Sequence, residues 1–144
     1  MNLFSENHCH LGDISPEEVI KAENAGLVLM ITMGLDAAST AVALKLASRH
    51  SSIRLSLAIH PWYSDEYDEE MRRVFVGLAE NSEVVAIGET GIYYTGRMSQ
   101  QGVRESRYID PDIQMATFRA HIGLARELDL PVIVHDKAPG AGGP

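Results

Sequence analysis

The stretch Leu27-Val28-Leu29-Met30-Ile31-Thr32-Met33 decides the fold class of this chain, because it is a continuous apolar run that only Thr32 interrupts. A run of this length is too short for a typical helix, and it is typical of a strand that is buried on both faces of a sheet. Strands of this kind occur mainly in parallel sheets that helices cover. We therefore expect an α/β protein built on parallel strands.

Segments on both sides of this run repeat the alternation of strand and helix. Residues 3–11, 53–59, 84–87 and 130–135 are further predicted strands, and helices are predicted over residues 15–25, 36–50, 68–80 and 110–129. The first helix begins with Ser15, Pro16 and Glu18, which supply a cap, a proline at the first helical position and a capping box. Strands that alternate with helices in this way predict successive βα units of a parallel sheet.

Length, composition and charge bound the class of protein. The chain has 144 residues, of which 45% are apolar and 22% are charged, as in one globular domain. It has no apolar run long enough to cross a bilayer, no signal-peptide pattern and a single cysteine, Cys9, so we expect a cytoplasmic protein. The net charge of −8 argues against broad electrostatic binding to nucleic acid or to an anionic membrane. It does not exclude a nuclease, because bound divalent cations reverse the field locally.

Metal-ligating residue types stand where the predicted strands end. His8 and His10 alternate along the first strand, so both side chains should point to the same face. His10, His60, Glu89 and His135 each follow an apolar strand run, and in parallel βα proteins these strand ends meet on the face that carries the active site. The alternative is that all four residues are structural and bind no metal. This explanation is weaker, because chemistry-bearing side chains rarely converge on that face by accident. The sequence therefore predicts a metal site.

The blocks that carry these residues resemble the TatD family of metal-dependent hydrolases, which are amidohydrolase-like TIM barrels. The resemblance extends from Leu3 to about Ala138. Its blocks are Asn7-His8-Cys9-His10-Leu11, Ile59-His60-Pro61-Trp62, Ile87-Gly88-Glu89-Thr90-Gly91-Ile92 and the segment from Gln114 to His135.

This resemblance implies a site with two divalent metal ions. It places His8 and His10 on one ion, Glu89 as the bridging and catalytic carboxylate, and His135 on the second ion, while His60 would contact a phosphate at the rim. Zn, Mn, Mg, Ni and Fe all remain open as the metal, because histidine and carboxylate ligands accept several ions. The implied activity is phosphodiester hydrolysis by metal-activated water on a nucleic-acid substrate, as in a deoxyribonuclease.

The resemblance also implies an incomplete barrel. A full barrel takes about 250 residues, and the family's later strands supply a further histidine and an aspartate that have no counterpart here. We expect residues 1–138 to form about five strands and four helices of the N-terminal portion, followed by a Gly/Pro-rich tail, residues 139–144, which cannot continue a helix. The tail predicts a truncated reading frame or an appended end. The family's usual aspartates are also replaced, at Glu6 and soon after Gly91.

Other interpretations stay open beside the hydrolase. A non-catalytic fragment would bind metal without turnover and self-associate to cover its open strand edges. An amidohydrolase acting on C–N bonds is less favoured, because Glu89 stands where many of those enzymes use a modified lysine. Trp62 and Tyr63 would either stack on a base or cover the barrel end. The arginines of the long loop, Arg97, Arg104 and Arg107, are candidate phosphate contacts.

Overall fold

The computed structural model describes residues 2–94 and 108–137, so the loop arginines and the predicted tail lie outside the described residues. The elements are β1 (Phe4–Cys9), η1 (Leu11–Asp13), α1 (Pro16–Asn24), β2 (Leu27–Gly34), α2 (Ala37–Ala47), β3 (Ile53–Leu57), η2 (Pro61–Glu66), α3 (Glu69–Leu78), β4 (Val84–Tyr93), α4 (Pro111–Leu128) and β5 (Val132–Lys137). The described residues form five parallel strands and four α-helices, which confirms the fold class that the sequence predicts.

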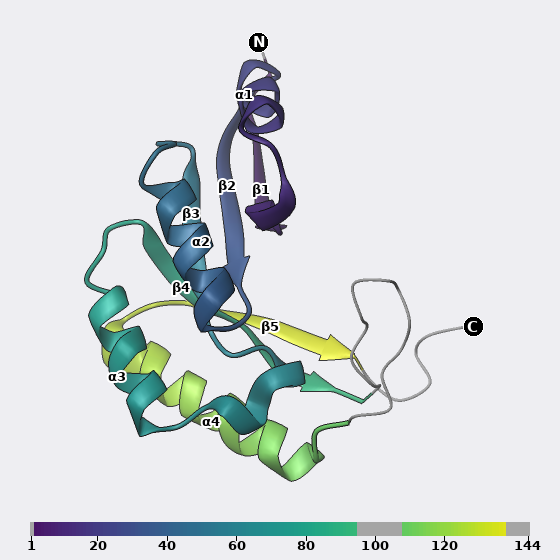
Figure 1. Ribbon diagram of the computed structural model, residues 1–144, viewed down its shortest axis with the longest axis vertical. Coiled ribbons are helices and arrows are strands. Elements are labelled where there is room, and N and C mark those ends of the chain that lie inside the picture. Colours follow the sequence, from purple (N-terminus) through teal and green to yellow (C-terminus); the bar gives the residue numbers. More distant parts are fainter. Residues whose placement is uncertain (1, 95–107, 138–144) are drawn as a thin grey trace.

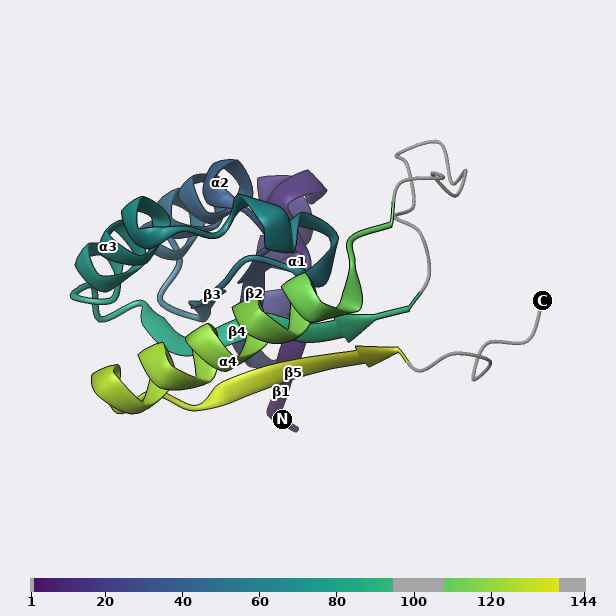
Figure 2. The same cartoon turned by 90° about the horizontal axis from the view of Figure 1, so that it is seen from below.

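The strand order identifies the architecture as part of a barrel. The five strands follow one another as β1-β2-β3-β4-β5, and each pairs in parallel with the next. Doubly wound sheets reverse their strand order at a switch point, whereas a barrel keeps adding strands in one direction. The sheet accordingly curls, and its helices lie along one side of it (Figures 1 and 2). The arrangement is a half-barrel.

The core lies between the sheet and these helices. Leu55 and Leu57 of β3 are fully buried and pack with Phe75 of α3 and Leu124 of α4. Burying each such side chain contributes roughly 1.5–3 kcal/mol relative to leaving it exposed. This core fixes the position of β3 and β4 relative to the outer helices, and with them the ends of the strands.

Side chains that cap the helices account for their starting points. Ser15 accepts a hydrogen bond from the backbone N–H of Glu18, and the Glu18 side chain accepts one from the Ser15 N–H, so the predicted capping box is confirmed. Asp36 and Ser39 form the same reciprocal pair at the start of α2. Of the helices that the structure describes, none combines the length and the hydropathy required to cross a bilayer.

Strands β4 and β5 both run further than the sequence indicates. The predicted strand over residues 84–87 continues to Tyr93, and β5 continues to Lys137, with Gly91 opposite His135 and Tyr93 opposite Lys137. The apolar pattern breaks at Glu89 and Thr90 because these polar side chains are themselves buried. Glu89 and His135 therefore lie within strands rather than after their ends.

Candidate metal centre

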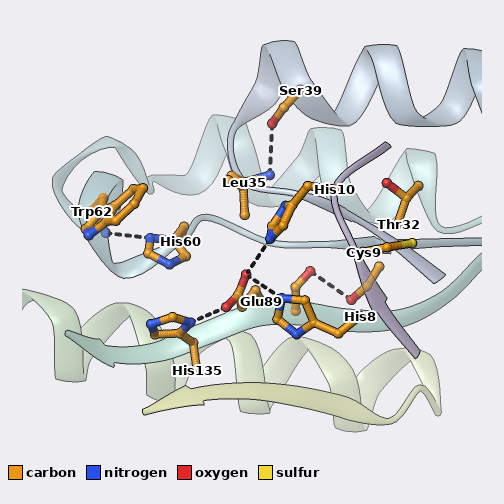
Figure 3. Close-up of polar contacts among 12 residues, drawn as sticks. His8, Cys9, His10, Thr32, Leu35, Ser39, His60, Trp62, Glu89 and His135 are labelled. Atoms are coloured by element: carbon orange, nitrogen blue, oxygen red, sulfur yellow. Dashed lines mark hydrogen bonds and ion pairs between the residues drawn. The ribbon is translucent and has the colours of Figure 1, made fainter. Parts of the chain in front are cut away.

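Glu89 is the side chain on which the predicted ligands converge. It projects from β4 and is only 2% exposed. Its Oε2 atom lies 3.5 Å from Nε2 of His8 and 3.9 Å from Nε2 of His10, and its Oε1 atom accepts a hydrogen bond from Nδ1 of His135 (Figure 3). Strands β1, β4 and β5 thus deliver their ligand-type side chains to one point.

The end of β1 supplies the histidine pair. The imidazole rings of His8 and His10 are 5.3 Å apart and meet edge to face, while the Cys9 thiol between them turns toward β2 and donates to the carbonyl of Ile31 at 3.2 Å. The two imidazoles are 41% and 52% exposed, so solvent reaches both rings. The predicted alternation of His8, Cys9 and His10 describes this arrangement correctly.

The spacing of these atoms suits a shared cation. Ligand atoms that are each about 2.1 Å from one ion lie roughly 3.0–3.5 Å from one another. The donor atoms of His8, His10 and Glu89, which we call the first ligand group, all lie within 4.8 Å of one another. The distances from Glu89 to both imidazoles are long for hydrogen bonds. Two imidazoles and a carboxylate are also a donor set that zinc, nickel, iron and manganese accept.

His135 offers a further ligand atom on the other side of Glu89. Because Nδ1 donates its proton to Glu89, the neutral ring carries its lone pair on Nε2. That atom is buried and has no hydrogen-bond partner among the described residues. A buried acceptor without a partner is costly unless something satisfies it, and a carboxylate–histidine pair of this kind is a common way to orient a metal ligand. The residues present therefore fit a divalent cation here as well.

His60 lies beside His135 and Glu89 but presents an N–H where His135 presents a lone pair. It is 3% exposed, and its Nδ1 accepts the backbone N–H of Trp62 at 3.1 Å (Figure 3). Burial lowers the pKa of His60 to about 3, against the opposing effect of the Glu89 carboxylate. The donor atoms of His60, Glu89 and His135 also lie within 4.8 Å of one another. The hydrogen bond at Nδ1, however, leaves the proton of the neutral His60 ring on Nε2, which makes that nitrogen a hydrogen-bond donor rather than a metal ligand.

Electrostatics keep Glu89 ionised. Burial raises the pKa of this carboxyl group, but the hydrogen bond from His135 and the electrostatic attraction of the surrounding imidazoles for the carboxylate outweigh that effect, so the pKa lies below its usual range. A group with a low pKa is a poor proton acceptor near neutral pH. Glu89 is thus suited to bind cations as a carboxylate rather than to act as a general base.

A hollow of about 360 Å³ joins these residues to others that the sequence reasoning missed. Tyr93 and Lys137 line it together with the ligand-type residues, Leu35, His60 and Trp62. Lys137 stands two positions after His135 on the same strand, and this period-two spacing could have placed it on the ligand side. The two aromatic residues after His60 have different surroundings. Trp62 lines the hollow, whereas Tyr63 packs against the hydrophobic core.

A buried histidine outside the hollow holds two of its walls in place. His121 of α4 accepts the backbone N–H of Ile59 through Nε2 at 3.2 Å, and its Nδ1 donates to the carbonyl of Thr117 at 2.8 Å. Its Nδ1 also lies 3.3 Å from the hydroxyl of Thr90, the residue after Glu89. These contacts make His121 a packing residue rather than a metal ligand.

Comparison with known proteins identifies the family that carries this arrangement. Residues 6–141 match the family described as "TatD related DNase". The chain belongs to the TatD family. The TatD homologue YjjV from Escherichia coli K12 has a crystal structure that covers 92% of this chain with a TM-score of 0.72 and 27% sequence identity. This structural match supports the interpretation of the curled sheet as half of a TIM barrel.

Curated members of the TatD family share the sequence over most of this chain. The "3'-5' ssDNA/RNA exonuclease TatD" of Erwinia amylovora is 36% identical over 121 residues, which cover 83% of this chain and 43% of that protein. The "Uncharacterized metal-dependent hydrolase YabD" of Bacillus subtilis is 30% identical over 140 residues, which cover 94% of this chain and 51% of that protein. The chain thus spans about half the length of the curated relatives it matches.

Proposed function

We propose that this chain acts as a TatD-type hydrolase that depends on divalent metal ions and cleaves phosphodiester bonds in nucleic acid. The observation that carries the proposal is the convergence of His8, His10 and His135 on the buried carboxylate of Glu89. The exonuclease name of the Erwinia relative and the hydrolase name of the Bacillus relative support the same chemistry. We propose that residues 1–138 represent the N-terminal portion of such a barrel.

In this proposal the two sides of Glu89 hold two cations. The first ligand group, His8, His10 and Glu89, would bind one, and His135 would bind the other through its unpartnered Nε2. Such ions, when bound, activate water and stabilise negative charge on phosphoryl and leaving oxygens. The metal remains open among Zn, Mn, Mg, Ni and Fe.

The protein's own groups orient the substrate and keep the charges in place. Glu89 stays a carboxylate throughout, because its pKa lies below the usual range. His60 presents its Nε2–H to the hollow and would donate to a phosphoryl oxygen, while the Trp62 backbone fixes the tautomer that makes this donation available. His60 is therefore the substrate-binding residue of the proposal.

Exchange of Glu89 for glutamine tests the proposal directly. Glu89→Gln keeps the size of the side chain but removes its charge, so we expect bound manganese, measured after dialysis by elemental analysis, to fall by at least half. Chelator-sensitive hydrolysis of a fluorescently labelled single-stranded oligonucleotide should disappear with it. Glu83→Gln, which changes a carboxylate at the groove between α2 and α3, is the matched control.

Either of two results would overturn the assignment. Unchanged metal content in Glu89→Gln would remove the ligand role of this residue. Metal binding without any hydrolysis by the wild-type chain would favour the second candidate, a non-catalytic fragment that self-associates. Exposed apolar residues on the edge strands, Phe4 at 52% and Val134 at 55%, favour that candidate's association with a second copy. A cytoplasmic location stays a prediction.

A further inference from the structure

The hollow beside Glu89 is lined in part by aromatic rings and by a cationic side chain to which the proposed function gives no role. Trp62 comes from the start of η2, Tyr93 from the end of β4 and Lys137 from the end of β5. All three line the same 360 Å³ hollow as His8, His10, Glu89 and His135. We call Trp62, Tyr93 and Lys137 the aromatic–lysine wall.

The sheet holds Lys137 close to the ligand residues. Lys137 pairs with Tyr93, two positions beyond the Gly91–His135 pair, so it lies on the same side of β5 as His135. Its Nζ atom is 3.4 Å from the Tyr93 hydroxyl and 5.2 Å from the centre of the Tyr93 ring. No carboxylate among the described residues forms an ion pair with it, so its charge is available to an anion.

Contacts with neighbouring rings hold Trp62 in place beside the hollow. Its backbone N–H is bonded to His60, and its indole meets the His60 ring edge-on at 4.6 Å and the Tyr93 ring edge-on at 5.4 Å. The side chain is only partly buried, and it borders the hollow. A partly exposed aromatic ring and a basic group that line the same hollow are the combination that proteins use to bind single-stranded nucleic acid, through base stacking and a phosphate contact.

We propose that Trp62 and Lys137 form a nucleotide subsite beside the metal centre, in which Lys137 contacts a backbone phosphate and Trp62 stacks on the adjoining base. The inference rests on the proposed function, since it names how that substrate is held. It also accounts for nucleic-acid binding by a chain whose net charge is −8, because the contact needs one local cation rather than a basic surface. Tyr93 positions Lys137 and does not itself contact the substrate.

The first test uses the fluorescence of Trp62, which is the only tryptophan in the chain. A single-stranded oligothymidylate is titrated into the full chain in the presence of chelator, so that binding is observed without hydrolysis. Stacking should quench the tryptophan emission in a saturable way. Binding that is detected by the anisotropy of a labelled oligothymidylate but leaves the tryptophan emission unchanged would overturn the role of Trp62.

The second test compares charge removal at two lysines. Lys137→Gln should weaken binding several-fold and reduce the slope of log K against log salt by about 0.7, the value for one phosphate contact on a single strand. Lys45→Gln removes the same charge from the groove between α2 and α3 and should change neither quantity. Lys137→Arg should keep the slope. Equal effects of Lys137→Gln and Lys45→Gln would overturn the subsite.

The third test separates the subsite from the hydrolase itself. With manganese present, Lys137→Gln should raise KM more than it lowers kcat, and Trp62→Ala should do the same, with a loss of affinity of roughly tenfold for one stacked base. Quenching and the lysine-dependent salt slope without any hydrolysis would support the subsite and overturn the proposed activity. Hydrolysis with an unchanged KM in both variants would support the activity and overturn the subsite.

Discussion

At the scale of single residues, hydrogen-bond partners decide what each histidine can do. His135 donates a hydrogen bond from Nδ1 to Glu89, so its Nε2 carries a lone pair. His60 instead accepts a hydrogen bond at Nδ1, so its Nε2 carries the proton. The sequence places both residues beside the site but does not distinguish a lone pair from a donor. For His60 the deciding contact is local, with the Trp62 N–H two positions later, whereas for His135 it is the approach of Glu89 from β4, which no local pattern contains.

Replacing His60 by asparagine and by glutamine tests the donor role. The amide of His60→Asn can reach the Trp62 N–H but not the substrate, so we expect kcat to fall roughly 100-fold, as for other lost transition-state donors. His60→Gln carries an N–H farther along the side chain and should lose less. Metal content should stay at the wild-type value in both variants. Loss of metal in His60→Asn would show instead that this residue is a ligand.

The protonation of His121 predicts an acid-labile fold. Burial lowers the pKa of His121 to about 4, against the opposing effect of its bond to the Thr117 carbonyl. The unfolded chain, with an ordinary histidine pKa near 6.5, therefore binds the proton first as the pH falls. The contribution of neutral His121 to the free energy of unfolding is complete above pH 6.5 and is lost as the pH falls from 6.5 to 4. At pH 5 this loss is on the order of 2 kcal/mol.

Urea unfolding at pH 7.5 and pH 5 measures this effect. His121→Gln should be less stable at pH 7.5, because a hydrogen bond to the Ile59 N–H or the Thr117 carbonyl is lost, but its stability should change less between the two pH values. An equal loss of stability in the wild type and in His121→Gln would assign the acid sensitivity to other groups. The contact of His121 with the backbone of Ile59, the residue before His60, is long-range and required the structure.

At the scale of elements, glycines bring β4 and β5 close enough to unite the site. A Cβ at Gly91, which has a φ of 148°, would lie 2.0 Å from the His135 carbonyl oxygen, and a Cβ at Gly88 would lie 2.6 Å from Cβ of Ile133. Both positions flank Glu89. The sequence block from Gly88 to Gly91 identifies the ligand, but the reason for its glycines is the approach of a strand more than forty positions later.

Alanine at Gly91 should therefore damage both the fold and the site. We expect Gly91→Ala to lower the free energy of unfolding by about 2 kcal/mol or more, because the new methyl group must push β5 away in a strained backbone region. Gly77→Ala is the control, since a Cβ there meets nothing within 4 Å inside α3 and should stabilise the helix by about 0.5–1 kcal/mol. Equal stabilities of the two variants would contradict the close approach of the strands.

The end of β4 depends on a side chain that sequence patterns do not explain. Gln114 of α4 accepts the backbone N–H of Tyr93 at 2.7 Å and donates to the carbonyls of Tyr93 and Ile109. The Gln114 amide thus satisfies the backbone N–H and C=O of Tyr93, which would otherwise need a neighbouring strand as partner. The helix pattern correctly predicted α4, but a buried glutamine on its inner face becomes intelligible only with β4 in place.

At the scale of the whole molecule, the order of the strands was readable from the sequence because each βα unit is local. Apolar runs, caps and turns fixed five strands and four helices, and parallel pairing of neighbours followed from connections of helical length. The shape of the hollow was not readable, because its lining residues come from β1, η2, β4, β5 and the segments that follow the first three strands, and their contacts are long-range.

The face of the sheet opposite the helices is apolar, and from it we predict that the chain self-associates in solution. Leu29, Ile31, Val85 and Ile133 line a hollow of about 580 Å³ on that face, and Val134 on the edge strand β5 is 55% exposed. Exposed apolar patches and edge strands favour association. Light scattering across a concentration series should therefore give a mass above that of one 15.8 kDa chain.

A matched pair of substitutions assigns that association to the strand edge. Val134→Lys places a charge on β5, where it opposes pairing with a second strand, and should shift the protein toward the monomer at a given concentration. Val74→Lys makes the same exchange on α3, at a side chain that is 46% exposed, and should leave the association unchanged. Because Val134 adjoins His135, metal content measured in parallel shows whether the ligand position survives. A wild-type mass equal to one chain at every concentration would mean that this face is stable in water on its own, and it would leave the hydrolase proposal without a self-associating alternative.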